Sequence, residues 1–271
     1  MLKDITLGQY FPGNSIAHKL DPRTKILLVT LYIIALFSAK GWMGYAVMAV
    51  TLAACVKVSH VGLRALVRGL KPLVFIIAFT GILNMFFTPD THYLWEWGIL
   101  RVSVKGIENA LFMVIRIMLL VMGTFLMTYT TSPIRLTDGL ESLLNPLKKI
   151  HVPVHELAMM MAIALRFIPT LIEETDKIMK AQMARGADFE DGNLIQKAKS
   201  MVPLLIPLFV SAFRRADDLA MAMEARCYSG GEGRTKMKPL RYQGTDRKAY
   251  VILIAFLVLV IVARVLLRWP Q

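Results

Sequence analysis

Cysteines and acidic side chains are scarce in this sequence. Cys55 and Cys227 are the only two cysteines in 271 residues, too few for a disulfide scaffold, and we expect both to be free thiols. Lysine and arginine together number 32 against 19 acidic residues, which gives a net charge of +13. A basic balance can indicate nucleic-acid binding, but in a membrane protein it more often reflects cytoplasmic loops beside anionic lipid, and we prefer that interpretation.

Signals of catalysis are also missing. The segment Gly230–Lys236 (GGEGRTK) lacks the spacing of a phosphate-binding loop, and no strand is predicted before it. His151 and His155 are four residues apart, but Pro153 between them breaks a common helical face, which argues against a metal pair. We therefore expect no catalytic residue, no metal site and no bound cofactor in this chain.

Apolar side chains, in contrast, are abundant. They make up 56% of the residues, whereas ordinary soluble domains have about 45–50%. They cluster in runs that approach the length of a membrane span once flanking lysines and arginines snorkel to the surface. The predicted fold class is an all-α integral membrane protein with about five transmembrane helices, at Ile26–Ala39, Trp42–Val56, Pro72–Pro89, Ile117–Thr131 (extended N-terminally through Arg116) and Ala249–Leu267.

Charges in the short loops predict the orientation of these spans. Eight lysines and arginines lie before the first span and after the second, whereas three lie in the loops on the opposite side. Because cytoplasmic loops are enriched in basic residues, we expect the N-terminus in the cytoplasm and, with five spans, the C-terminus outside. Arg264 and Arg268 near the C-terminus run against this rule.

Three regions are predicted along the chain. Residues 1–131 form an N-terminal transmembrane region of about four spans, residues 132–248 a cytoplasmic module of about three helices, and residues 249–271 a C-terminal transmembrane helix. Two helices of the module are long, from about Pro153 to Arg185 and from about Leu194 to Arg226. Each has an apolar part followed by a charged part. Prolines in the apolar parts are expected to bend these helices, at Pro169, Pro203 and Pro207.

Both long helices are predicted to end on the same motif. We call Ala184-Arg185-Gly186 the first triplet and Ala225-Arg226-Cys227 the second triplet. The helix macrodipole explains a single arginine at such an end, and Gly186 suits the position that closes a helix; Gly230-Gly231 is the corresponding candidate further on. Because the motif occurs twice and arginine offers a rigid fork of donors, it predicts two equivalent binding sites on a dimeric or pseudo-dimeric partner.

Methionine is the other unusual feature of these helices. Eight of the seventeen methionines lie between Met159 and Met223. Any one of them is explained as apolar filler, but as a group they are typical of a surface that repacks against different partners. The cluster Met159, Met160 and Met161 is the candidate contact for such a partner.

The motifs together resemble the T component (EcfT) of energy-coupling factor transporters, over almost the entire chain and most closely the group II, vitamin-type systems. They are HKLDPRTK (His18–Lys25), the segment Leu143–Leu171 and the two triplets. The resemblance implies a non-catalytic coupling subunit of a bacterial cell membrane. It would bridge two ABC-type ATPases, which bind the ATP, to an exchangeable S subunit that captures a vitamin. Each triplet would occupy a groove of one ATPase. Cys227 stands where the family often has glycine, and we expect little consequence.

Two other classes of function remain as alternatives. A self-contained secondary transporter or channel needs paired intramembrane charges or interrupted spans, and apart from Arg116 the predicted spans have neither. A membrane enzyme needs a nucleophile or an acid–base pair near the interface, and the sequence offers no such set. Uptake by vesicles that contain this chain alone would favour the first alternative.

Overall fold

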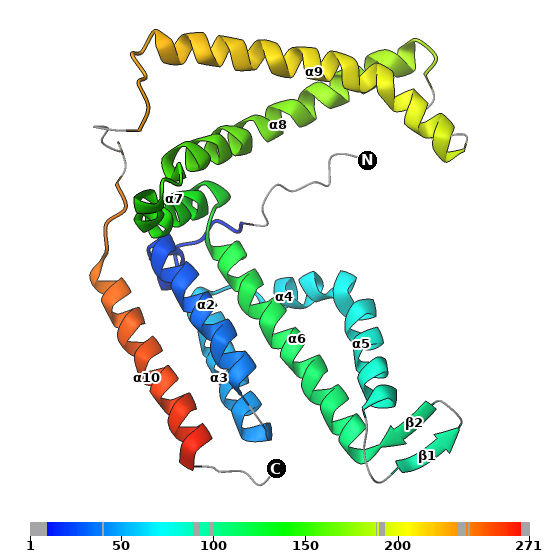
Figure 1. Ribbon diagram of the computed structural model, residues 1–271, viewed down its shortest axis with the longest axis vertical. Coiled ribbons are helices and arrows are strands. Elements are labelled where there is room, and N and C mark those ends of the chain that lie inside the picture. The colour runs from blue at the N-terminus through cyan, green and yellow to red at the C-terminus, as the bar shows by residue number, and fades with distance from the viewer. Residues whose placement is uncertain are drawn as a thin grey trace. The chain divides into compact units, whose positions relative to one another are not determined.

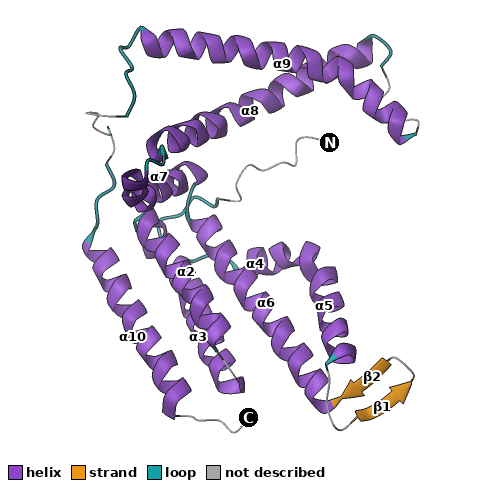
Figure 2. Ribbon diagram, viewed as in Figure 1, coloured by secondary structure: helices purple, strands orange, loops and turns teal. Residues whose placement is uncertain are grey.

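The computed structural model describes residues 10–39, 41–88, 93–97, 100–187, 189, 193–231, 237 and 239–266. Helices dominate these residues (Figures 1 and 2). The chain divides into two compact units. The bundle unit contains the described residues up to Leu140 together with 240–266, and the long-helix unit is Glu141–Pro239.

The bundle unit is organised around one long helix, α6, which packs against α2, α3, α4 and α5, while α10 packs against α2 and α3. Its core includes Leu36, Met48, Leu66 and Tyr129, each at most 2% exposed. The elements are α1 (Ile16–Lys19), α2 (Pro22–Ser38), α3 (Gly41–Ser59), α4 (Leu63–Leu70), the 3-10 turn η2 (Lys71–Leu73), α5 (Val74–Phe87), β1 (Tyr93–Trp97), β2 (Leu100–Ser103), α6 (Val104–Thr130), α7 (Pro133–Leu144, of which 133–140 belong to this unit) and α10 (Gly244–Leu266).

Apolar side chains also cover the outside of this unit. Phe75, Val50 and Ile252 are each more than two-thirds exposed. Exposed apolar surface of this extent is unfavourable in water but is the lipid-facing surface of a membrane protein. Among the described residues, four helical segments are long and apolar enough to cross a membrane: Gly41–Ser59, Leu63–Phe87, Val104–Thr130 and Val154–Ala184.

The comparison with the predicted spans is mixed. Three of the four segments overlap the second, third and fourth predicted spans, of which the third and fourth were predicted to end two residues and one residue later. The first predicted span falls on α2, whose 17 residues reach about 25 Å, slightly less than a hydrocarbon core of about 30 Å. The last falls on α10. The fourth segment, Val154–Ala184, belongs to a helix that the sequence places in the cytoplasmic module, so the number of five spans stays a prediction.

Two short elements are absent from the sequence-based expectation. The charge pattern predicts a loop after the second span, but this region forms the amphipathic helix α4, with Arg64 and Arg68 exposed and Leu66 and Leu70 buried. The all-α class is confirmed for the described residues, although β1 and β2 add one short antiparallel hairpin. Aromatic residues alternate along β1, at Tyr93, Trp95 and Trp97, and this pattern favours a strand.

The long-helix unit contains the 3-10 helix η3 (Asn145–Ile150), α8 (Val154–Ala184) and α9 (Leu194–Glu224), and α8 packs against α9. The predicted bounds of both long helices are confirmed to within two residues. The unit begins and ends nine residues away from the predicted region 132–248. The physical reason is that the start of α7 packs on α2, where a Cβ on Gly139 would lie 3.0 Å from Cβ of Pro22.

Candidate functional site

The helices α8 and α9 share a common construction. Each has 31 residues, about 46 Å at 1.5 Å per residue. Pro169 lies inside α8, and Pro203 and Pro207 lie inside α9, all in continuous helix. The start of α9 is fixed by a capping box, in which Asn193 caps the helix and Gln196 accepts a hydrogen bond from the Asn193 N–H. Bends at the three prolines stay a prediction.

The first triplet ends α8 in a Schellman motif. The Gly186 N–H donates to the carbonyl of Met183 at 3.0 Å, and the Ala187 N–H donates to that of Gln182 at 3.0 Å. This pair of bonds requires a left-handed residue, and Gly186 has φ +87°. Because backbone donors satisfy the carbonyls of Gln182 and Met183, the Arg185 side chain is not needed to cap these two. Ala184, Arg185 and Gly186 are all exposed.

The second triplet ends α9 with the same geometry. The Cys227 N–H donates to the carbonyl of Glu224 at 2.8 Å, and the Tyr228 N–H donates to that of Met223 at 3.0 Å. The left-handed residue here is Cys227, with φ +56°. Ala225, Arg226 and Cys227 are all exposed.

The two triplets are therefore equivalent position by position. Arg185 and Arg226 both stand directly before the left-handed residue, at the negative end of a helix macrodipole. One expectation is corrected: Gly230-Gly231 does not close the second helix, because the chain already turns at Cys227. The substitution of cysteine for glycine has a consequence as well, since a non-glycine residue in this conformation is strained.

An ion pair fixes where α8 and α9 meet. The Arg215 guanidinium donates to Glu174 Oε2 at 2.8 Å, and the Ser211 hydroxyl donates to the other carboxylate oxygen. Gln182 also donates to the carbonyl of Pro203 at 3.4 Å, so the two helices run in opposite directions along their contact. Arg185 lies eleven residues after Glu174, and Arg226 lies eleven residues after Arg215. Each triplet thus stands about 16 Å beyond the pair along its own helix.

The sequence did not indicate this ion pair. Ser211 and Arg215 are four residues apart and so share a helical face, which is a signal available in advance. That Glu174 is their partner depends on the position of α8 along the axis of α9. Residue spacing within one helix does not determine this position. Next to the pair, apolar side chains of both helices line a shallow groove of about 250 Å³: Ile163, Phe167, Leu171, Ala212, Ala216, Leu219, Ala220 and Met223.

The methionine cluster lies near the beginning of α8. Met160 and Met161 are exposed and Met159 is half-buried, whereas Val154 and Ala158 on the same stretch are buried. The structure therefore leaves two of the three thioethers accessible to another molecule. Their role as a partner contact stays a prediction.

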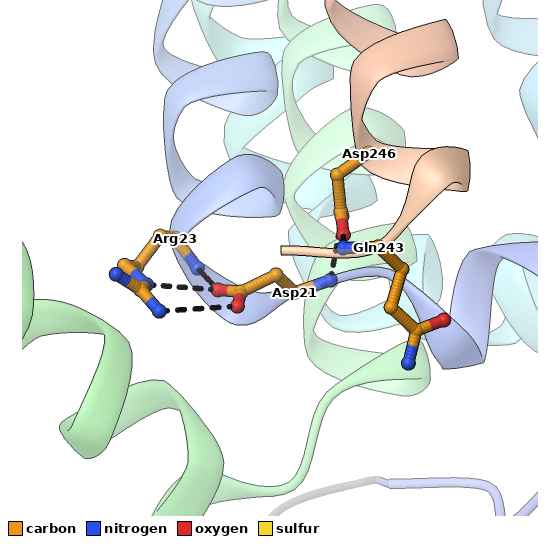
Figure 3. Close-up of polar contacts among 4 residues, drawn as sticks. All are labelled: Asp21, Arg23, Gln243 and Asp246. Atoms are coloured by element: carbon orange, nitrogen blue, oxygen red, sulfur yellow. Dashed lines mark hydrogen bonds and ion pairs between the residues drawn. The ribbon is translucent and has the colours of Figure 1, made fainter. Parts of the chain in front are cut away.

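The HKLDPRTK segment has a structural role in the bundle unit (Figure 3). Asp21 caps α2, and its own N–H donates to Asp246 Oδ1 at 2.9 Å, while Asp246 Oδ2 accepts from the Gln243 N–H at 2.7 Å. One fully buried carboxylate thus joins the starts of α2 and α10. Arg23 pairs with Asp21 at 3.2 Å and lies 4.4 Å from the ring centre of Tyr242. These contacts hold the start of α10 against the start of α2.

Comparison with known proteins gives a consistent result. A protein-family model described as "Cobalt transport protein" (CbiQ) matches residues 13–237. A protein of Thermosediminibacter oceani is 57% identical over 250 residues, which cover 92% of this chain and 94% of the relative. One of Ruminiclostridium cellulolyticum is 54% identical (96% and 97% covered), and one of Bacillus subtilis is 47% identical (97% and 100% covered). All three are named "Energy-coupling factor transporter transmembrane protein EcfT".

Proposed function

Since the chain belongs to the CbiQ/EcfT family and is thus the transmembrane T component of an energy-coupling factor transporter, we propose that its two triplets are the contacts through which two ATPases drive it. The observation that supports this proposal most directly is the equivalence of the triplets. Two exposed arginines, held in the same cap geometry at the same distance from one ion pair, suit two equivalent grooves on a paired partner.

The chemistry of the contact follows from the cap. The Schellman motif satisfies two of the carbonyls at each helix end without using the arginine side chain, so each guanidinium can bind a carboxylate or backbone carbonyls of the partner. The neighbouring alanines, Ala184 and Ala225, are too small to shield the arginine stem. ATP is bound and hydrolysed by the partner ATPases in this proposal, and the T component carries neither ATP nor the transported substrate.

The second part of the proposal concerns the substrate-binding S subunit. Met160 and Met161, exposed near the start of α8, are proposed to contact or support an exchangeable S subunit that captures a vitamin or another micronutrient. Unbranched thioether side chains can repack against related but different surfaces, which suits exchange. The T component then transmits ATPase motion along α8 and α9 in the cell membrane, with the N-terminus in the cytoplasm and the C-terminus outside.

Co-purification tests both parts. Arg185→Glu and Arg226→Glu should each weaken retention of the ATPases and abolish uptake while membrane insertion survives, because truncating one side of a desolvated charged contact typically costs about 2–5 kcal/mol. Arg214→Glu, which changes an exposed arginine of α9 in the same way, is the matched control and should retain both ATPases. Wild-type yields of both ATPases with the Arg185/Arg226 double variant would contradict the proposal.

The S-subunit part has its own arm in the same experiment. Replacing Met160 and Met161 together by serine should lower the yield of a tagged S subunit while the ATPases stay bound. An unchanged S-subunit yield would remove these methionines from the proposal without affecting the triplets. Substrate uptake by vesicles that contain this chain alone would instead favour a self-contained carrier or channel.

A further inference from the structure

Arg116 lies deep within a membrane-spanning helix. It is residue thirteen of the 27 residues of α6, about 18 Å from Val104 and about 21 Å from Thr130 along the helix axis. A hydrocarbon core of about 30 Å takes about 20 residues, and every such window within α6 places Arg116 at least five residues from its edge. An ionisable side chain at this depth is costly, and its charge needs a partner.

The neighbours of Arg116 orient the guanidinium but do not neutralise it. Its Nε and Nη2 atoms both donate to the Tyr45 hydroxyl, at 2.9 and 2.5 Å. Its central carbon lies 5.7 Å from the ring centres of Phe37 and Tyr45. In the part of the chain that the structure describes, no carboxylate forms an ion pair with Arg116. Tyrosine and phenylalanine rings stabilise a cation, yet the full positive charge remains.

The surroundings of Arg116 have the composition of a bilayer interface. Tyr45 is buried and stacks on Phe112 at 5.1 Å, and Trp42 lies 4.9 Å from the same Phe112 ring. Phe37 at the end of α2 and Trp42 at the start of α3 are each more than half exposed. Figure 1 shows these two helix ends on one side of the bundle unit, next to α6. Exposed aromatic residues at helix ends are typical of the depth of lipid headgroups.

We propose that Arg116, oriented by Tyr45, binds the phosphate group of an anionic phospholipid in the leaflet nearer the α2–α3 turn. The guanidinium N–H groups that Tyr45 does not accept would donate to phosphate oxygens, as a fork that phosphate matches well. The half-buried side chain can extend along α6 toward the surface while its stem stays among the aromatic rings. The exposed rings of Phe37 and Trp42 would contact the glycerol and upper acyl region of the same lipid.

Two other sources of a negative charge are less consistent with this site. Inorganic phosphate would have to enter a region flanked by exposed aromatic rings without its hydration shell, at a high desolvation cost. An acidic side chain of a membrane partner would need a protein surface to cover Phe37 and Trp42, whereas lipid covers such rings in every bilayer. The lipid is therefore the occupant to which the proposal commits.

Competitive lipid binding tests the site. The full chain, purified in detergent, is given phosphatidylglycerol and phosphatidylcholine in equal amounts, and native mass spectrometry measures the ratio of the two bound lipids. The wild-type chain should prefer phosphatidylglycerol, and Arg116→Gln should lower this preference about tenfold or more, the loss expected for a charge-assisted contact. Tyr45→Phe should lower it less, and Arg214→Gln, an equal loss of charge on α9, should leave it unchanged.

Each other outcome overturns the proposal. Equal lipid ratios for wild type and Arg116→Gln would remove lipid phosphate as the ligand. Loss of the bound phosphatidylglycerol in excess sodium phosphate would assign the site to a soluble anion. No lipid preference, combined with release of a co-purified membrane protein by Arg116→Gln, would assign it to that protein. If Arg116→Gln does not fold, Arg116→Lys is measured in its place. Lysine keeps the charge but lacks the fork of donors, so this variant should retain only part of the preference for phosphatidylglycerol.

Discussion

Exchanging the left-handed residues of the two triplets tests whether their backbone geometry is the same. Gly186 closes α8 with φ +87°, and Cys227 closes α9 with φ +56°. A side chain in this region brings Cβ close to the following carbonyl oxygen, whereas glycine has no Cβ. We therefore expect Cys227→Gly to stabilise the end of α9 and Gly186→Cys to destabilise the end of α8.

The magnitude follows from the surroundings of the two residues. A Cβ built on Gly186 meets no atom beyond its chain neighbours within 4 Å, so the cost of Gly186→Cys comes from the local backbone conformation and not from a clash with the rest of the molecule. That cost is about 1 kcal/mol. A change of about 1 kcal/mol alters the equilibrium constant for opening of the helix end about fivefold at 25 °C. Cys227→Gly should give a change of similar size and opposite sign.

Amide hydrogen exchange in detergent measures this opening directly. The reporters are the Ala187 and Tyr228 amides, which donate to the carbonyls of Gln182 and Met223 and exchange only when the cap opens. Cys227→Gly should slow exchange at Tyr228 about fivefold, and Gly186→Cys should accelerate exchange at Ala187 by a similar factor.

The control variant is Cys227→Ala, which removes the thiol but keeps a Cβ in the left-handed conformation. It should exchange at Tyr228 like the wild-type chain. If Cys227→Ala and Cys227→Gly protect Tyr228 equally, then a Cβ at this position does not strain the backbone and the reasoning is refuted.

Two further predictions concern the contacts that hold the helices in place. Glu174→Gln should weaken the meeting point of α8 and α9 by about 1 kcal/mol, since it removes the charge that Arg215 pairs with while keeping the size; spin labels at the two triplets should then report a broader distance distribution, and an unchanged distribution would contradict the role of the pair. Asp246→Ala should leave the N–H groups of Asp21 and Gln243 unsatisfied, each at about 1–3 kcal/mol, and lower the unfolding temperature in detergent. Asp246→Asn, which retains one acceptor oxygen, should lower it less, and equal temperatures for both variants would contradict this assignment.

Features encoded in short stretches of sequence were the predictable ones. The bounds of α8 followed from Pro153 and Gly186, because proline before a helix and glycine after it act locally. The same local rule failed at the end of α9, where it pointed to Gly230-Gly231 but the chain turns at Cys227. Cysteine is not typical of the left-handed conformation, so the sequence does not indicate that Cys227 adopts it.

Contacts between distant segments were not predictable from spacing. Asp21 and Asp246 are 225 residues apart, and nothing near either carboxylate indicates that one of them accepts the backbone N–H of the other. The amphipathic helix α4 was missed for a different reason, since its basic residues were counted as loop charges. Arg116 was assigned to an extension of a span that begins at Ile117, whereas α6 continues for twelve residues before it and so places it deep in the helix.

The position of the ion pair constrains how the two triplets can move. Arg185 and Arg226 stand on opposite sides of the Glu174–Arg215 contact, each about 16 Å from it along its own helix axis, so the displacements along the two axes add to at most about 33 Å. While this contact holds, neither arginine can be displaced along its helix axis without displacing the other helix. A partner that changes the spacing of its two arginine sites must then change the angle between α8 and α9. The angle between the helices, and not a bend within either one, is therefore the quantity that we expect to couple the triplets to the apolar half of α8.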